Sequence, residues 1–283
     1  NYKNFAVIRL METYVFSRIA SLDRRFNEVD ILIQQAEQSV NDDQLYSIYC
    51  RAAHIILVAH FEESIKEICK DIIDDINKNL SYNSIPDQIF ATYCDYFLLK
   101  EKKEFTTKSL HSLQIKLRDA FGSSKAKLKV EPFLLSKDKN PAPAIINSIL
   151  ERFGVNKFFR SLTNSDLDVV FQDSKTEVEE LRTKLKSYVK SKTSEYPFEV
   201  ARDIYTPDNS ISMEQNVRTM WEEFIDDILK ERHSIVHGQS LVINYDHKSI
   251  SVSRIKIEII IYVFIINICI VSNPKVIDKQ DLS

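Results

Sequence analysis

The N-terminal third of the chain repeats apolar residues at helical spacing and predicts two long helices. In the first, over residues 9–38, the repeating residues are Leu10, Tyr14, Phe16, Ile19, Leu22, Phe26, Val29 and Ile33. In the second, over residues 44–79, they are Ile48, Ile55, Val58, Phe61, Ile65, Ile68, Ile72 and Ile76. Asn41, Asp42 and Asp43 lie between the two patterns. Because short polar side chains favour turns and helix caps, we expect a tight connection there.

A third strong pattern is the almost continuous apolar run of residues 255–271. Its uncharged part, residues 259–271, is shorter than the about 20 residues that a membrane-spanning helix needs. We therefore expect no membrane contact, and a helix that other helices or a second subunit cover on nearly all sides. The many β-branched residues leave a strand as the alternative.

Prolines and polar stretches divide the middle of the chain into shorter elements. Helices are predicted over residues 87–102, 144–153 and 177–192. The last of these is rich in charged residues, so it is expected to face solvent. Residues 194–212 read as a long connection.

Two short stretches near the C-terminal end flank a polar tripeptide and predict a small β-hairpin. They are residues 241–245 and 249–253. Between them lie Asp246, His247 and Lys248, which would form the turn.

Composition favours an all-α fold, namely a helical bundle with additional helices and at most that one hairpin. Hydrophobic residues make up 44% of the chain and charged residues 28%, and only three glycines leave little material for a turn-rich β fold. We expect a single domain over residues 1–283. An inserted or mobile region is predicted at about residues 166–212.

The cysteines match neither a zinc site nor a disulfide framework, because their spacing is irregular. They are Cys50, Cys69, Cys94 and Cys269. A cytoplasmic location is expected, and no signal peptide is recognised at the N-terminus.

The formal net charge of −3 excludes a general nucleic-acid binder, so any RNA contact must come from a local basic patch. One such patch lies in the middle of the chain. Its residues are Lys100, Lys102, Lys103, Lys108, Lys116, Arg118, Lys125, Lys127 and Lys129. Ordinary solvated lysines are the alternative interpretation.

Residues 221–238 predict an amphipathic helix with an arginine in its apolar face. The apolar positions are Trp221, Phe224, Ile225, Ile228, Leu229, Ile235 and Val236, and Arg232 projects from their centre. A buried guanidinium needs carboxylates, carbonyls or a phosphate to offset its desolvation. Gly238 follows, where a helix closes in a left-handed residue. Arg232 is therefore either a functional cation or a structural member of a buried ion pair.

Two histidines, His233 and His237, lie in the row beside Arg232. A fixed cation and imidazoles that titrate near neutral pH suit the handling of a phosphodiester. At spacing i, i+4 the two rings could also chelate a metal. No glutamate follows His233 and no further ligand cluster is apparent, so neither a metal nor another cofactor is expected.

The segment Glu231-Arg232-His233-Ser-Ile-Val-His237-Gly238 resembles the Arg-(polar)-x3-His signature of the HEPN superfamily. The helix around Ala59-His60-Phe-Glu62 resembles the Ala-His-x-Glu helix of the bacterial RiboL-PSP/MAE-like HEPN branch, and residues 140–154 are similar to its middle segment. The resemblance covers roughly residues 45–270. Residues 166–208 fit the family pattern poorly.

The resemblance implies a HEPN-type helical bundle and a metal-independent endoribonuclease acting as a toxin or an anti-phage defence effector. Arg232 would neutralise the phosphoryl oxygens and His237 would act as general base on the ribose 2′-hydroxyl, with His233 assisting. Products would carry 2′,3′-cyclic phosphates. Relatives usually dimerise with their motif helices facing each other, so we expect an RNA substrate, a homodimer with a composite active site, and an antitoxin or defence-system partner.

Two further residues are candidate supporting groups. Glu62 lies at the margin of its helix's apolar stripe and is a predicted partner for Arg232; the alternative is an ordinary ion pair with Lys66, one turn on. His60 lies opposite that stripe, which favours contact with solvent or a partner subunit. The other histidines are expected to be surface or capping residues, and they are His54, His111 and His247.

Two other function classes remain open. A non-catalytic HEPN module would use the same residues to bind RNA, a nucleotide or a partner protein without chemistry. A structural or adaptor protein would use Arg232 only as a buried ion-pair member, and its substitution would then unfold the protein.

Overall fold

The computed structural model describes residues 12–101, 106–134, 140–163, 165–172, 175–205, 218–238 and 245–274. Nearly all of the regular structure in these ranges is helical, which confirms the all-α prediction. The α-helices are α1 Tyr14–Gln38, α2 Asp43–Asn79, α3 Asp87–Glu101, α4 Thr107–Phe121, α5 Pro143–Phe153, α6 Phe158–Leu162, α7 Lys175–Lys192, α8 Met220–Val236 and α9 His247–Val271. The 3-10 helices are η1 Tyr82–Ser84, η2 Glu131–Phe133, η3 Asp166–Phe171 and η4 Arg202–Ile204.

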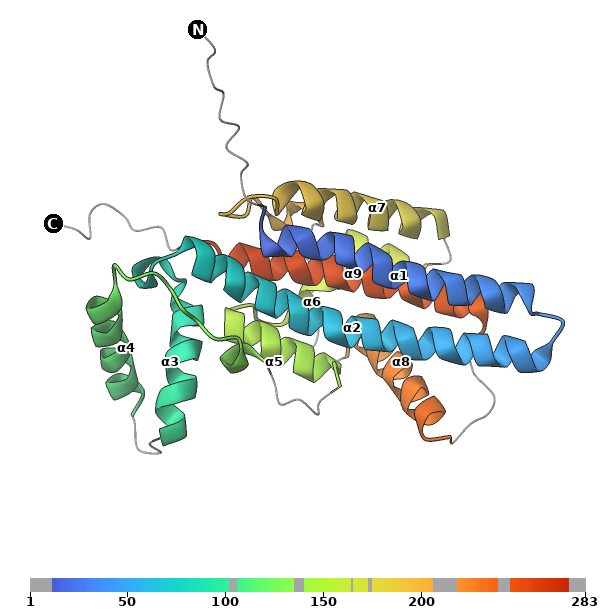
Figure 1. Cartoon of the computed structure of the whole chain (residues 1–283), viewed down its shortest axis with the longest axis horizontal. Helices are drawn as coiled ribbons and strands as arrows, with labels where there is room; N and C mark the ends of the chain where they lie inside the picture. The colour runs from blue at the N-terminus through green and yellow to red at the C-terminus, as the bar shows by residue number, and fades with distance from the viewer. Residues whose placement is uncertain are drawn as a thin grey trace, which may run out of the picture.

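Helices α1 and α2 form a long antiparallel hairpin, as their periodicity predicts (Figure 1). Asp42 caps α2 by accepting hydrogen bonds from the backbone N–H groups of Gln44 and Leu45. The predicted start of the first helix at residue 9 lies outside the described residues, but the helix begins later than predicted, at Tyr14, with Thr13 as its N-cap. The polar turn therefore joins the two helices as expected.

Helix α9 packs along both members of this hairpin (Figure 1). Almost every side chain from Ile255 to Cys269 is buried, including polar Asn267. The prediction of a helix covered on nearly all sides is confirmed, and the strand alternative is wrong. Among the described helices, none is long and apolar enough to cross a membrane.

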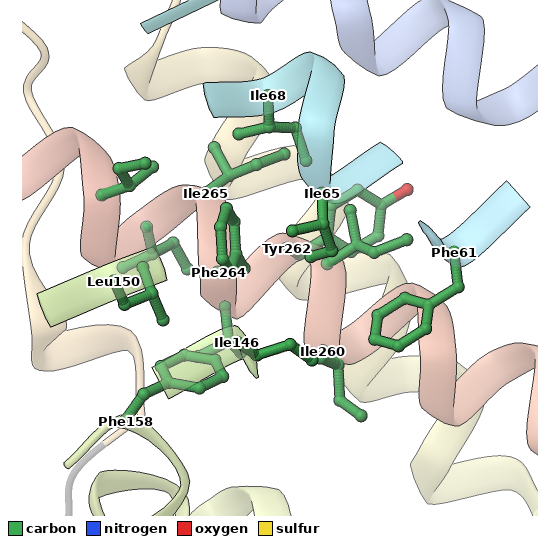
Figure 2. Packing of buried hydrophobic residues seen from close by; sticks show 14 of the residues in the cluster. Phe61, Ile65, Ile68, Ile146, Leu150, Phe158, Ile260, Tyr262, Phe264 and Ile265 are labelled. Carbon is green, nitrogen blue, oxygen red and sulfur yellow. The ribbon is translucent and has the colours of Figure 1, made fainter. Parts of the chain in front are cut away.

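The core brings together residues that are distant in the sequence (Figure 2). In the close-up, Ile65 and Ile68 from α2 lie on one side of α9, and Ile146 and Leu150 from α5 lie on the other. Phe158 of α6 contacts Phe264 of α9 edge-on, with ring centroids 6.2 Å apart. Helix α9 is therefore the central element around which the bundle is built.

A charged network is buried on α9 between α1 and α7. Glu258 is only 1% exposed and accepts hydrogen bonds from Arg254 at 2.7 Å, Tyr262 at 2.6 Å and Arg182 at 3.3 Å. Arg254 also donates to Asp30 of α1 at 2.8 Å. Burial raises the pKa of Asp30, and the nearby Arg254 guanidinium opposes that rise. The network therefore links α9 to α7 through Glu258 and to α1 through Arg254.

The predicted β-hairpin is wrong in the part that the structure describes. Residues 249–253 form the first turns of α9, and residues 241–244 lie outside the described residues. Asp246 caps the helix by accepting a hydrogen bond from the backbone N–H of Ser249 at 2.7 Å. Burial of Ile250 and Ser253 against the bundle then favours helix over the local alternation.

Helix α7 is less exposed than its charge predicts. One face packs against α9 and α1, and its buried residues are Val178, Leu181, Leu185 and Val189. The charged residues occupy the rest of its surface, and two of them reach back to the bundle, since Arg182 pairs with Glu258 of α9 and Lys186 with Asp23 of α1. An inserted region at about residues 166–212 stays a prediction, but α7 within it is an integral part of the bundle.

Asp75 of α2 forms hydrogen bonds with the first residues of α1. Its carboxylate accepts hydrogen bonds from the backbone N–H groups of Tyr14 at 2.9 Å and Val15 at 3.2 Å. Burial raises the pKa of Asp75 to about 6, and these two N–H groups oppose the rise. The folded protein thus binds this proton more tightly than the unfolded chain, where the pKa is 3.8. The stability from this proton is fully present below pH 3.8 and is lost as the pH rises through about 6.

We expect Asp75→Asn to remove this pH dependence. Relative to the variant, the wild type should lose about 2 kcal/mol of unfolding free energy between pH 4 and pH 7. Urea unfolding at several pH values measures the difference. Asp74→Asn is the matched control, because Asp74 makes neither bond to α1; an equal pH effect in both variants would contradict the assignment.

Candidate functional site

Helix α8 is positioned by a well-formed N-terminus and a buried apolar face. Thr219 and Glu222 form a reciprocal capping box at its start. Trp221 packs edge-on against Phe171 of η3 with ring centroids 4.9 Å apart. The buried apolar residues of α8 recur at helical spacing, and they are Trp221, Ile225, Ile228 and Leu229. The predicted apolar stripe is therefore confirmed over the first turns.

The last turns of α8 leave the bundle, and the stripe ends there (Figure 1). Ile235 is half-buried and Val236 is 52% exposed. The last helical residues therefore present their side chains at the surface of the subunit.

Arg232 is half-buried, so the prediction of a fully buried guanidinium is wrong. Its Nη1 donates a long hydrogen bond of 3.5 Å to Oδ1 of Asn140. Within the described ranges no carboxylate forms an ion pair with it. The preceding Glu231 is the buried charged residue, 6% exposed. Periodicity placed Arg232 on the apolar stripe but could not show where the helix leaves its neighbours.

His233 and His237 lie beside Arg232 on the same exposed end of α8. Both are exposed, and their ring centroids are 4.2 Å apart at an interplanar angle of 51°. His237 is the C-cap, and its backbone N–H bonds to the carbonyl of His233. Gly238 follows with φ of +64°, as predicted for a left-handed closing residue. The structure therefore brings together the arginine and both histidines of the predicted catalytic set.

The two supporting candidates are engaged elsewhere. Glu62 pairs with Lys66 at 2.9 Å, which is the ordinary ion pair given as the alternative. His60 Nε2 lies 3.0 Å from Glu28 Oε2 of α1. Neither residue makes a described contact with Arg232, so the contacts in the subunit give them no place in the cluster at the end of α8.

His54 is the residue that the sequence interpretation misplaced. It is fully buried, and its Nε2 donates to the Ile228 carbonyl of α8 at 2.9 Å. Its ring centroid lies 5.3 Å from that of Tyr245. Burial lowers the pKa of His54, and the Ile228 carbonyl opposes that shift. The spacing along α2 does indicate that His54 is buried. His54 precedes Val58 and Phe61 by one and two helical turns, and both of these residues lie on the buried face of α2.

The two remaining histidines match their expected roles more closely. His111 is exposed on α4. His247 is the first residue of α9, and its Nδ1 lies 3.1 Å from the hydroxyl of Tyr46. In the described part of the chain, no group of three or more His, Cys, Asp or Glu residues could hold a metal ion. All four cysteines are buried and free.

The chain matches the model of a known protein family. The family model RiboL-PSP-HEPN matches residues 20–273, which includes α2, α8 and the cluster of Arg232, His233 and His237. No curated protein and no solved structure matches the chain. The HEPN family includes many ribonucleases. Because the match spans most of the chain, this protein belongs to the RiboL-PSP-HEPN family.

Proposed function

We propose that this protein is a metal-independent endoribonuclease whose reactive groups are Arg232, His233 and His237. The observation that carries the proposal is that His233 and His237 are exposed beside the half-buried Arg232 at the C-terminal end of α8, with no carboxylate among the described residues neutralising the arginine. An accessible cation beside two imidazoles is suited to a phosphodiester. A purely structural arginine would instead be buried against a carboxylate, as Arg254 is.

In the proposed reaction His237 removes the proton from a ribose 2′-hydroxyl. The 2′-oxygen then forms a bond to the adjacent phosphorus, and the bond from phosphorus to the 5′-oxygen breaks. His233 gives a proton to the leaving 5′-oxygen, while Arg232 neutralises the charge on the phosphoryl oxygens. The products are a 2′,3′-cyclic phosphate and a 5′-hydroxyl. DNA is not cut by this route because it lacks the 2′-hydroxyl.

We also propose that two copies pair through the ends of their α8 helices. The exposed Val236 and half-buried Ile235 next to the reactive groups support this, since a second copy would cover them. A cytoplasmic toxin or anti-phage effector, with an antitoxin or defence-system partner, fits the family membership and the four unpaired cysteines.

The direct test incubates wild type and His237→Ala with total tRNA and a mixed RNA pool in EDTA. We expect fragments with 2′,3′-cyclic phosphate ends from the wild type and none from the variant. His111→Ala is the matched control, because this exposed histidine lies on α4 and should retain activity. Thermal melting checks that all three proteins fold.

Two outcomes would contradict the proposal. Cleavage by His237→Ala at the wild-type rate would remove His237 from the reaction. Absence of cleavage by well-folded wild type would favour the non-catalytic module, in which the same groups bind RNA, a nucleotide or a partner protein without chemistry.

A further inference from the structure

The segment that follows α4 alternates lysines with buried small or apolar residues. In residues 125–129, Ala126 is 1% and Leu128 5% exposed, whereas Lys125, Lys127 and Lys129 are all exposed. We call these three lysines the lysine row. Because alternate side chains of an extended segment point to opposite faces, the lysine row lies along one side of the segment.

The backbone of the lysine row is held at several points. Ala126 donates its N–H to the carbonyl of Leu80 at 2.9 Å. Asn77 of α2 bonds to both backbone groups of Leu128, accepting from its N–H at 2.6 Å and donating to its carbonyl at 2.8 Å. In Figure 1 the segment crosses the C-terminal end of α2 beside α3. The three lysines are therefore presented by a fixed backbone rather than by a free loop.

The charge of the lysine row is not neutralised by the surrounding described residues. None of its three amino groups forms an ion pair or hydrogen bond with the part of the chain that the structure describes. Residues 106–130 contain six lysines and arginines and one acidic residue, a net charge of +5, although the whole chain carries −3. One of the six, Arg118, is paired with Asp87 of α3. A concentrated positive surface on an acidic protein favours a polyanionic partner.

The spacing of the lysine row fits one strand of nucleic acid. Extended backbone rises about 3.3 Å per residue, so successive lysines of the row are about 7 Å apart. Adjacent phosphates along an extended single strand have a similar separation. Three lysines in a line can therefore contact three consecutive phosphates.

A group of aromatic rings on α3 meets the lysine row through Tyr93. The Tyr93 hydroxyl donates to the carbonyl of Lys127 at 3.4 Å. Phe97 packs edge-on against both Tyr93 and Tyr96, with ring centroids 5.1 and 5.0 Å apart. Tyr96 and Phe97 are more than a third exposed, which leaves their rings accessible for stacking with bases.

We propose that the lysine row and these aromatic rings form a binding surface for single-stranded RNA. The choice of RNA over DNA rests on the proposed function. The binding of phosphates by the lysine row does not depend on that function. An anionic membrane fits less well, because the apolar residues that alternate with the lysines are buried and cannot insert into lipid. The surface holds substrate through its backbone while the end of α8 does the chemistry.

The test measures binding of a fluorescent oligo-uridine by anisotropy at several salt concentrations, in the His237→Ala background so that no cleavage interferes. The variant carries Lys125→Glu, Lys127→Glu and Lys129→Glu. We expect at least about a tenfold loss of affinity and a reduction of about 2 in the slope of log K against log salt, since single strands contribute about 0.7 per phosphate contact. Substitution of the same three residues by arginine should retain both.

The matched control places the same charge change elsewhere with Lys70→Glu, Lys184→Glu and Lys190→Glu, three exposed lysines without described ion pairs. An equal loss in both triple variants would overturn the inference, because net charge alone would then explain it. Unchanged RNA binding combined with lost binding to phosphatidylserine vesicles would also overturn it and assign the surface to a membrane. RNA binding through the lysine row by a wild type that cuts no RNA would overturn only the proposed function.

Discussion

Replacing Glu258 by alanine is expected to lower the unfolding free energy by about 3 to 5 kcal/mol, a large part of the total stability of a typical domain. Glu258 is nearly fully buried and accepts hydrogen bonds from Arg254, Arg182 and Tyr262. Without its carboxylate the Arg254 guanidinium stays buried with only Asp30 as an acidic partner among the described residues. The cost comes from that poorly compensated charge rather than from the lost pair itself.

The matched control for Glu258→Ala is Glu62→Ala. Both glutamates pair with a basic residue four positions away on their own helix, Arg254 and Lys66 respectively. Glu62 is half-buried and its ion pair is solvent-accessible, so we expect its loss to cost less than about 1 kcal/mol. Urea unfolding measures both. Similar losses for the two variants would show that the α9 network is not a dominant contribution to stability.

Arg232→Ala is expected to reduce the rate of RNA cleavage by about 100-fold to 1000-fold and to leave the melting temperature nearly unchanged. The loss in rate follows because Arg232 is the group that neutralises the phosphoryl oxygens in the proposed reaction. Stability should be retained because Arg232 is half-buried and makes only a long hydrogen bond to Asn140 within the described residues. Arg232→Lys should restore part of the rate, since it keeps the charge but loses the planar fork.

Two other arginines provide the comparison for Arg232. Arg24 is exposed on α1, and Arg24→Ala should change neither cleavage nor melting. Arg254→Ala should lower the melting temperature strongly, because it removes a buried partner of Glu258. A melting loss for Arg232→Ala as large as that for Arg254→Ala would support the structural interpretation of Arg232 instead.

Sequence periodicity identified the helices that the core depends on, and the physical reason is plain. Helices α1 and α2 repeat apolar residues over many turns, so the buried face is specified many times over. The run of residues 259–271 is uncharged and almost entirely apolar, which predicts a helix with neighbours on nearly every side. Such a pattern shows which face of a helix is buried, but it does not show which other helix covers that face.

Features that depend on how helices meet were not predictable in the same way. The periodicity of α8 placed Arg232 on its apolar stripe, but the structure shows the stripe emerging from the bundle before Val236. His54 was expected at the surface, but α8 packs against α2 and covers it. The Ile228 carbonyl of α8 then accepts the hydrogen bond that the buried imidazole donates. For Glu62 the sequence offered two possible partners, Lys66 one turn away on the same helix and Arg232 on another helix. The structure shows the ion pair with Lys66.

The predicted hairpin failed for a related reason. Residues 249–253 alternate apolar and polar side chains, which locally favours a strand. The helix cap at Asp246 and the long apolar run that follows extend α9 back through this stretch. The strong helical preference of the apolar run in α9 therefore determines the conformation of the ambiguous residues 249–253.

The central position of α9 has a consequence for the order of events during translation. Helices α1 and α2 leave the ribosome before α9, yet the helix that completes their buried face ends at Val271. At typical elongation rates, synthesis from the end of α2 to the end of α9 takes on the order of ten seconds. During that interval the nascent hairpin exposes its apolar face to chaperones. Because α8 packs against α2 and is synthesised only shortly before α9, it too reaches its place in the bundle late in translation.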